Sequence, residues 1–388
     1  GQASGWSQPA MWEMGLLSAP DWQAAWLNDG KANPQTDEAF YQEDPAPLFR
    51  KEFALPKPIA RARLYLTGLG YYEASLNGRR VGDQMLDPGW TRYSERVFYS
   101  VYDVTEQLRS GANCMGVMLG NGWYNPLPLR MWGYLNLRQH VPVGRPRFLA
   151  QLEVEFQDGT RQTIASDRSW KVGEGAIRFD SIYLGEIYDA RKAVPGWDGA
   201  GFDDAAWRPA AVASEPVGAL RAQAQPPIRV TKTLKTASVT EPKPGVFIFD
   251  LGQNFGGWAT LKLAAPAGTK ITLRYGELLN KDGTLNPMTS VAGQIKGARK
   301  NRDGKMESSG GPGAPPIAWQ SDTYIAAGQG VETYTPRFTF HAFRYVELTG
   351  FAGPVTPDMI TGLRLNTDVG RAGAFACSND LFNRIQDL

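Results

Sequence analysis

The sequence predicts an all-β protein with two antiparallel, jelly-roll-like β-sandwich domains. The first observation is alternation: Ala62, Leu64 and Leu66 are apolar, and the residues between them are Arg or Tyr, the pattern of a half-buried strand. The second is hairpin chemistry, because Asn77-Gly78 and Asp158-Gly159 tolerate the positive φ angles of tight turns. The third is length, since 388 residues exceed what one hydrophobic core normally serves.

The first sandwich is predicted over residues 21–225. Residues 28–47 are polar and end near two prolines, and residues 125–144 are rich in Pro, Gly and Arg, so both stretches are typical of loops. Residues 215–227 have the composition of a linker. The expected strands are 48–55, 61–66, 73–81 (which turns at Asn77-Gly78), 96–104, 114–119, 146–156, 160–165 and 166–172.

The strand at 114–119 runs directly into Gly120-Asn121-Gly122-Trp123-Tyr124. Glycine lets a ligand approach the backbone, an Asn amide hydrogen-bonds hydroxyl groups, and a Trp face packs on apolar C–H surface. Asn121, Trp123 and Tyr124 are therefore the candidate sugar-binding residues. The alternative is a structural role, with a tight turn, an Asn cap and two core aromatic rings.

The second sandwich is predicted over residues 226–365. Its clearest strands are 245–251, 257–263, 270–277, 323–326 and 343–349. Residues 286–316 interrupt it with Lys, Gly, Ser and Pro and few large apolar side chains. Burial cannot offset the entropy of ordering such a stretch, so we expect it to be poorly ordered or to reach away from its own sandwich.

Composition excludes several classes of function. The formal net charge is +2, which gives no reason to expect a nucleic-acid or membrane partner. No apolar run is long enough to span a bilayer. The two cysteines, Cys114 and Cys377, are too few for a Cys-based zinc site. The chain opens with Gly1 and lacks the regions of a signal peptide, so we expect its start to have been processed or cut.

Six motifs give a family resemblance. They are LTGLGYYEASLNG (66–78), DPGWT (87–91), LGNGWY (119–124), YLGEIYDAR (183–191), FDLGQNFGGW (249–258) and FTFHAFRYV (338–346). In this order they resemble the β-sandwich portion of bacterial α-L-rhamnosidases, which are inverting glycoside hydrolases. The resemblance extends over nearly the whole chain.

The resemblance implies four parts. Residues 1–20 would be the last strand of a preceding immunoglobulin- or fibronectin-like domain, and 21–225 the N-terminal sandwich. Residues 226–365 would be a concanavalin-like sandwich, and 366–388 the start of the catalytic (α/α)6 barrel. Ser378 is expected to cap the first barrel helix, which places Leu381, Phe382 and Ile385 on one face.

Glycoside hydrolysis requires two carboxyl groups that flank the scissile bond. In the family these groups lie in the barrel, and no residue of this chain matches the barrel motifs, so we assign no catalytic residue. Glu186 and Asp189 are the pair to consider within the sandwich. An ion pair between Asp189 and Arg191 that pins the loop is the favoured role.

The resemblance also implies rhamnose-binding modules that use calcium. Asp180, Glu186 and Asp189 could supply hard oxygen ligands, although calcium loops group their acidic residues more closely. No cofactor is required by the predicted function, and calcium is the metal that the resemblance allows. His341, near Arg344 on a predicted strand, is expected to be a hydrogen-bonded residue at a domain interface.

The predicted function is that of the accessory, non-catalytic part of an α-L-rhamnosidase, which hydrolyses terminal α-L-rhamnosyl residues. Its partners would be the catalytic barrel of the same parent chain and a rhamnose-containing carbohydrate. The alternatives are a stand-alone carbohydrate-binding or structural module, and the front half of a different sugar hydrolase. In a stand-alone module the apolar face at 381–385 would have partners within the chain. A periplasmic or secreted location is favoured over a cytoplasmic one.

Overall fold

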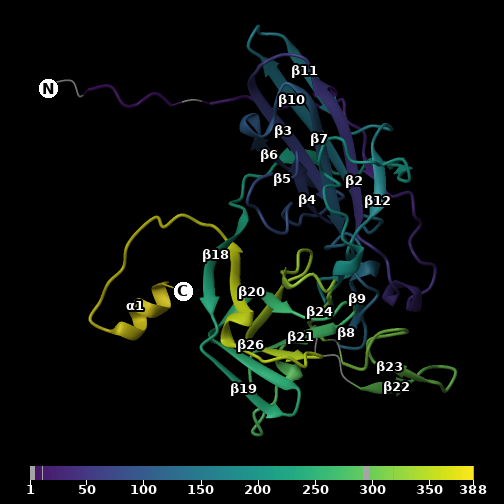
Figure 1. Ribbon diagram of the computed structural model, residues 1–388, viewed down its shortest axis with the longest axis vertical. Coiled ribbons are helices and arrows are strands. Elements are labelled where there is room, and N and C mark those ends of the chain that lie inside the picture. The colour runs from purple at the N-terminus through teal and green to yellow at the C-terminus, as the bar shows by residue number, and fades with distance from the viewer. Residues whose placement is uncertain (1–4, 11, 292–296, 318, 388) are drawn as a thin grey trace.

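The computed structural model describes residues 5–10, 12–291, 297–317 and 319–387. Two bodies of β-structure lie one above the other, and the terminal segments extend away from them (Figure 1). Within the described residues, α1 (Asp380–Asp387) is the α-helix. No helix there is long and apolar enough to cross a membrane.

The first domain is a sandwich of two sheets, as the sequence predicts. One sheet has seven strands: β16 (Ala211–Val212), β1 (Leu27–Asn28), β10 (Arg147–Phe156), β3 (Ile59–Leu69), β6 (Arg96–Asp103) and β17 (Ala219–Ala222) in that order, with β11 (Arg161–Ala165) paired to β10. The other sheet has six strands: β15 (Arg208–Pro209), β12 (Lys171–Glu174), β2 (Pro47–Leu55), β7 (Gly111–Gly120), β4 (Tyr71–Leu76) and β5 (Arg79–Arg80).

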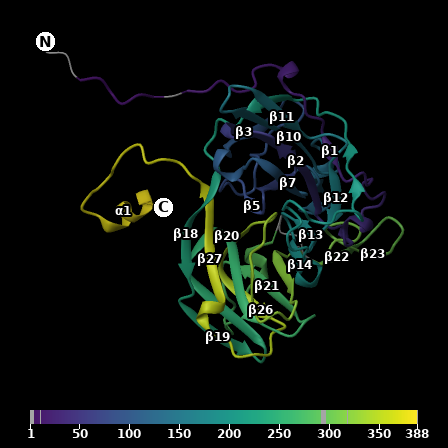
Figure 2. The same cartoon turned by 45° about the horizontal axis from the view of Figure 1, so that its top comes forward.

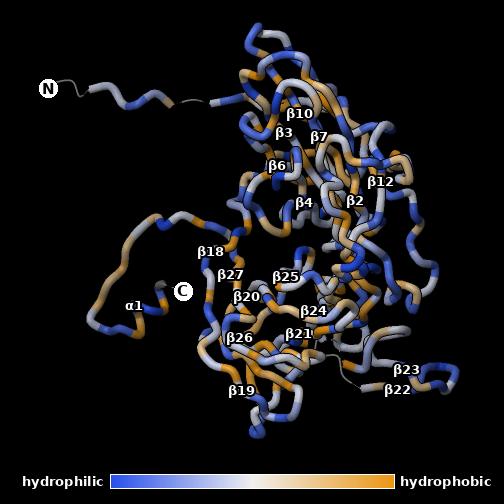
Figure 3. The backbone as a smooth tube through the Cα atoms, in the orientation of Figure 1, coloured by the Kyte–Doolittle hydropathy of each residue, from blue (hydrophilic) through white to orange (hydrophobic). Residues whose placement is uncertain are grey.

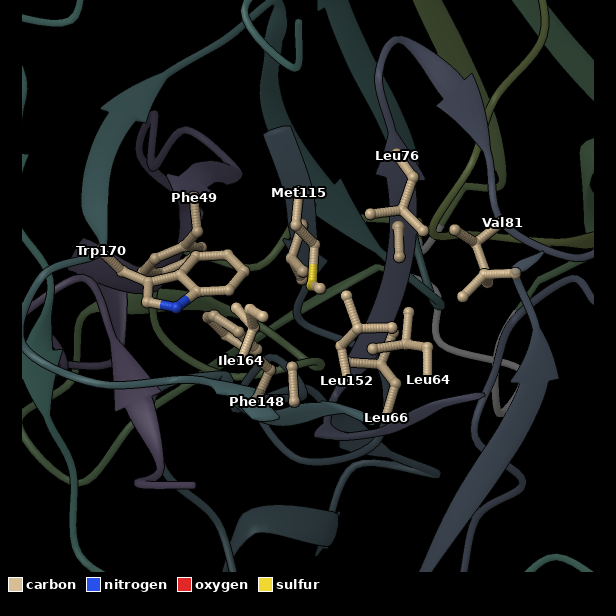
Figure 4. Packing of buried hydrophobic residues seen from close by; sticks show 14 of the residues in the cluster. Phe49, Leu64, Leu66, Leu76, Val81, Met115, Phe148, Leu152, Ile164 and Trp170 are labelled. Carbon is tan, nitrogen blue, oxygen red and sulfur yellow. The ribbon is translucent and has the colours of Figure 1, made fainter. Parts of the chain in front are cut away.

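The core of this domain lies between the two sheets (Figure 4). Leu64 and Leu66 of β3 and Leu152 of β10 face Phe49 of β2 and Met115 of β7, and all five side chains are fully buried. The alternation seen in the sequence therefore corresponds to one core-facing row of a strand.

The predicted hairpin turn at Asn77-Gly78 is confirmed. Asn77 has a φ of 53° and Gly78 a φ of 77°, as a type I′ turn between β4 and β5 requires. The Asn77 amide also donates to Asn113 Oδ1 at 2.9 Å and accepts from Cys114 N at 2.9 Å. These bonds tie the turn to the neighbouring strand β7.

The second domain is a curled ten-stranded sheet, below the first in Figure 2. Its strands are, in order, β13 (Ile177–Ser181), β14 (Gly185–Asp189), β24 (Ser321–Ile325), β21 (Lys270–Gly276), β26 (His341–Thr349), β20 (Val246–Ala264), β27 (Ile360–Thr367) and β18 (Ile228–Lys235), with β19 (Ser238–Lys243) and β25 (Val331–Tyr334) also paired to β20.

Two strands that were predicted separately form one long strand. The sequence suggested strands at 245–251 and 257–263, but β20 runs through both. Its register against β26 shifts between Asp250 and Phe255, and Gly252 has a φ of 75°. At Gly257 a Cβ atom would lie 2.0 Å from Leu363 O. The glycines let one strand bend and change partners, from β19 to β27 and β25, without ending.

The prediction that residues 21–225 form one sandwich is wrong for the hairpin β13–β14. This hairpin joins the second sheet, where Ile187 pairs with Thr323 in parallel. The strands β17 and β6 also pair in parallel, so the antiparallel arrangement has two exceptions among the described strands. A hairpin from the first half of the chain therefore forms one edge of the second domain.

Both ends of the chain differ from expectation. In the described residues from 5 to 17 no strand forms, although Glu13 forms an ion pair with Arg63. At the other end, the cap of α1 is Asn379 and not Ser378, because Asn379 Oδ1 accepts a hydrogen bond from Leu381 N at 3.0 Å.

The stretch at 286–316 does reach away from its own sheet, as expected; its degree of order stays a prediction, and residues 292–296 lie outside the described residues. It contains the hairpin formed by β22 (Ala298–Lys300) and β23 (Met306–Ser308). A second small hairpin, formed by β8 (Arg130–Met131) and β9 (Leu135–Asn136), comes from the first domain. Arg130 N donates to Gly310 O at 2.8 Å, so the two hairpins lie side by side.

Candidate functional site

The predicted sugar-binding turn lies where β7 meets the second domain. A Cβ atom on Gly120 would lie 2.2 Å from Cγ of Phe338, a fully buried residue that precedes β26. The missing side chain of Gly120 thus makes room for a phenyl ring of the other domain. The expectation that this glycine gives a ligand access is not supported by the geometry.

The side chain of Asn121 is fully engaged with protein partners. Its backbone N–H donates to Asp180 Oδ1 at 2.7 Å, and its Nδ2 donates to Asp180 Oδ2 at 3.0 Å. Its Oδ1 accepts from Asn125 Nδ2 at 2.7 Å, and Asn125 Oδ1 accepts from Arg138 Nη1 at 2.9 Å. Asn121 therefore holds a buried carboxyl group and presents no spare amide to a hydroxyl group.

The two aromatic side chains of the turn also pack against other aromatic rings, although Trp123 is only half-buried. Trp123 stacks on Trp90 with ring centroids 4.8 Å apart and meets the edge of Tyr183. Tyr124 is buried, with the edge of Tyr93 against it. The geometry favours the structural alternative for all three candidate residues.

We expect Asn121→Ala to destabilise the protein by about 1–3 kcal/mol, because it removes donors from the buried Asp180. A melting curve measures this loss. Ligand-observed NMR with tens of millimolar L-rhamnose should give the same absence of binding for the wild type and the variant, with calcium or with a chelator. Binding that the substitution abolishes at an unchanged melting temperature would restore the turn as a sugar site.

The three candidate metal ligands do not converge. Asp180 binds Asn121, Glu186 accepts from Tyr334 Oη at 3.0 Å, and the Asp189 carboxylate pairs with Arg191 at 2.8 Å. In the described part of the chain, no group of three or more His, Cys, Asp or Glu side chains could hold a metal ion. The residues therefore do not fit a calcium site. The predicted Asp189–Arg191 ion pair is confirmed.

The junction between the domains instead contains a buried polar cluster. The Glu186 carboxyl group is fully buried, and besides Tyr334 it accepts from Arg337 N at 3.1 Å. The Arg337 guanidinium pairs with Glu73 of β4, which also pairs with Arg80 at 3.1 Å. This chain of contacts connects the second sheet to the first domain.

A second buried carboxylate, Asp322, lies beside Glu186 in this cluster. Asp322 accepts from Glu186 N at 2.9 Å, from Tyr275 Oη at 2.5 Å and from His341 Nε2 at 3.0 Å. The His341 ring stacks on Tyr275 with centroids 3.9 Å apart. His341 is thus a hydrogen-bonded residue, as predicted, but its partner belongs to the same sheet.

Burial dominates the protonation of this region. It raises the pKa of Glu186 to about 8, with a smaller contribution from the neighbouring Asp322 carboxylate, and it raises the pKa of Asp180 to about 7. Hydrogen bonds from Arg191 instead lower the pKa of Asp189. Because Glu186 has no exposed surface, it cannot reach a glycosidic bond, and the cluster is suited to holding the domains together.

Sequence reasoning missed Glu73, Asp322 and Arg337. Each has an ordinary position in a strand or loop, and their partners are far away in the chain: Glu186 and Arg337 are 151 residues apart, and Arg337 and Glu73 are 264 apart. One available signal was polar character at strand positions that should be buried, such as Asp322 beside Thr323 and Tyr324.

Two family models match the chain. One describes the α-L-rhamnosidase N-terminal domain and matches residues 57–232, and the other describes the bacterial α-L-rhamnosidase concanavalin-like domain and matches residues 240–366. An α-L-rhamnosidase from Streptomyces avermitilis is 40% identical over 387 residues, which are 99% of this chain and 34% of that protein.

Solved structures agree with these matches. The α-L-rhamnosidase from Dictyoglumus thermophilum superposes with a TM-score of 0.78 at 40% identity, covering 96% of this chain and 39% of that one. The Streptomyces avermitilis enzyme, complexed with L-rhamnose, superposes with a TM-score of 0.75 at 41% identity, covering 89% of this chain and 31% of that one. The chain spans about a third to two fifths of these relatives. It belongs to the bacterial α-L-rhamnosidase family, of which it contains the N-terminal and concanavalin-like domains.

Proposed function

We propose that this chain is the accessory, non-catalytic part of an α-L-rhamnosidase and that it supports the helical catalytic domain of the parent protein. The observation that carries the proposal is the exposed apolar face of α1. Leu381, Phe382 and Ile385 are 53%, 55% and 59% exposed. An isolated helix of eight residues is marginal in water, so α1 requires a partner on this face.

This observation also separates the proposal from its main alternative. In a stand-alone module the apolar face of α1 would pack against one of the two domains. The helix instead lies apart from both, at the end of an extended segment (Figures 1 and 2). A helical domain that continues from α1 would cover its apolar side chains.

The proposed substrate of the parent enzyme is a glycoside or polysaccharide with terminal α-L-rhamnosyl residues. The Streptomyces avermitilis relative was solved with L-rhamnose bound, which supports this class. In this chain the best-placed carboxyl groups are committed to structure, because Glu186 is buried and Asp189 is ion-paired. The two carboxyl groups that the chemistry needs are therefore proposed to come from the helical domain.

We expect the 388-residue chain alone to hydrolyse no rhamnoside. The measurement is release of 4-nitrophenol from its α-L-rhamnopyranoside, with the full-length Streptomyces avermitilis enzyme as the positive control. Turnover that disappears in Glu186→Gln or Asp189→Asn would contradict the proposal. As a second measurement, Leu381→Ser/Phe382→Ser/Ile385→Ser should leave the melting temperature unchanged, whereas a clear decrease would favour the stand-alone module.

A further inference from the structure

The two small hairpins β8–β9 and β22–β23 form one projecting surface, at the lower right of Figure 1. A Cβ atom on Gly133 would lie 3.9 Å from Nη1 of Arg299 and 3.9 Å from Ser309 O, so the tip of one hairpin contacts the other. Arg130 fixes the pair through its ion pair with Glu307 at 3.2 Å. The surface is therefore assembled from both domains of the chain.

This surface concentrates positive charge. Residues 297–306 contain four basic residues and one acidic residue, a net charge of +3, whereas the whole chain has +2. The basic side chains are exposed, and none of them forms an ion pair with a described residue. Figure 3 shows the turn between β22 and β23 in the blue of strongly hydrophilic residues. The four basic residues are Arg299, Lys300, Arg302 and Lys305.

Large aromatic side chains stand beside these charges. Trp132 is 54% exposed and Tyr134 is 76% exposed at the tip of the β8–β9 hairpin. Trp132 has a φ of 53°, a left-handed conformation that bulky residues rarely adopt. Exposure of such large rings to water is unfavourable. The rings also offer flat apolar faces on which a ligand can pack.

We propose that these hairpins form a binding surface for an acidic polysaccharide. The carboxylate or sulfate groups of the polymer pair with the four basic side chains, and Arg299 and Arg302 match either group with two parallel N–H donors. The C–H faces of its sugar rings pack on Trp132 and Tyr134. The proposal does not depend on the rhamnosidase role, because the surface includes neither the buried carboxyl groups nor the apolar face of α1 on which that role is based.

The distribution of charge favours a polysaccharide over nucleic acid. Proteins that bind duplex DNA tightly neutralise many phosphate groups, but the charge here is confined to one hairpin in a chain of nearly balanced composition. A polysaccharide with one acidic group per sugar carries less charge along its length than duplex DNA, which has one negative charge per about 1.7 Å, and its rings present apolar C–H surfaces. A short basic strip flanked by exposed rings matches that chemistry.

The test is affinity electrophoresis of the 388-residue chain in native gels that contain polygalacturonic acid, dextran sulfate or neutral dextran. We expect at least one acidic polymer to retard the chain and neutral dextran not to retard it. Retardation by polygalacturonic acid indicates recognition of carboxylate groups, and retardation by dextran sulfate indicates recognition of sulfate groups. Raising the salt from about 50 to 200 mM should weaken binding about tenfold. The variant with Arg299, Lys300, Arg302 and Lys305 all replaced by Ala should bind at least about tenfold more weakly.

A matched variant removes the same charge elsewhere, at Arg168, Arg221, Lys235 and Lys281, which are exposed. It should keep the wild-type affinity, while Trp132→Ala/Tyr134→Ala should weaken binding and leave its salt dependence intact. Melting curves confirm folding of each variant. The proposal is wrong if no acidic polymer retards the chain, if the two charge variants behave alike, or if duplex DNA or anionic phosphatidylserine vesicles bind equally well.

Discussion

Replacing Gly120 by Ala is expected to destabilise the protein by about 3 kcal/mol, because overpacking a close-packed interior forces its neighbours to move. The new methyl group would lie 2.2 Å from the Phe338 ring, which is itself fully buried. Urea denaturation of the variant and the wild type measures the difference in the free energy of unfolding.

Gly256→Ala is the matched control, since no heavy atom lies within 4 Å of the added Cβ. It should leave stability nearly unchanged. Phe338→Ala alone should cost about 3–5 kcal/mol, but Gly120→Ala should add little to it, because the ring that it strikes is gone. Strictly additive effects in this double-mutant cycle would show that Gly120 does not serve the contact between the domains.

Glu186→Gln is expected to remove a large part of a decline in stability between pH 5 and pH 9, and Asp180, whose pKa is raised to about 7, contributes the rest of that decline. The folded protein raises the pKa of Glu186 to about 8, whereas an unfolded Glu has a pKa near about 4.3. Between these values the folded state binds a proton that the unfolded state lacks. The free energy of unfolding therefore falls as the pH rises, by about 1.4 kcal/mol per unit of pKa difference.

The glutamine can keep the native contacts, with its Nε2 donating to Tyr334 Oη and its Oε1 accepting from Arg337 N. Urea denaturation at several pH values gives the free energy of unfolding as a function of pH. Between pH 5 and pH 9 this free energy should fall by several kcal/mol less in the variant than in the wild type. Asp189→Asn is the control: the pKa of Asp189 is lowered, so its contribution is lost below about pH 4. Equal slopes for the wild type and Glu186→Gln would mean that Glu186 is ionised in the folded protein.

The strands of the first domain were predictable because their signals are local. Leu64 and Leu66 alternate with polar residues, and Asn77-Gly78 specifies its own turn. Local signals misled at β20, where glycines that usually end a strand allow one to bend. They also misplaced β13–β14, because no local pattern identifies the sheet to which a hairpin adds.

The candidate site was less predictable, because a rim turn that binds sugar and one that packs a domain interface have the same composition. Asn121 was identified from the sequence as a candidate binding residue, but its hydrogen-bond partner Asp180 is 59 residues away in the chain. The opening beside Gly120 is occupied by Phe338, more than 200 residues later. Such pairings depend on tertiary structure, and the family resemblance supplies the order of the domains but not these contacts.

The place of β14 in the second sheet has a consequence for how the chain acquires its structure. During synthesis, β14 leaves the ribosome more than 130 residues before its neighbour β24. The two strands pair through Ile187 of β14 and Thr323 of β24. Until then its outer edge has unpaired N–H and C=O groups, a template for association with other chains. The closure of so long a loop also slows folding. The two domains are therefore not independent folding units. A nascent or truncated chain that ends before β24 exposes an unpaired, association-prone strand edge, which β24 covers in the complete fold.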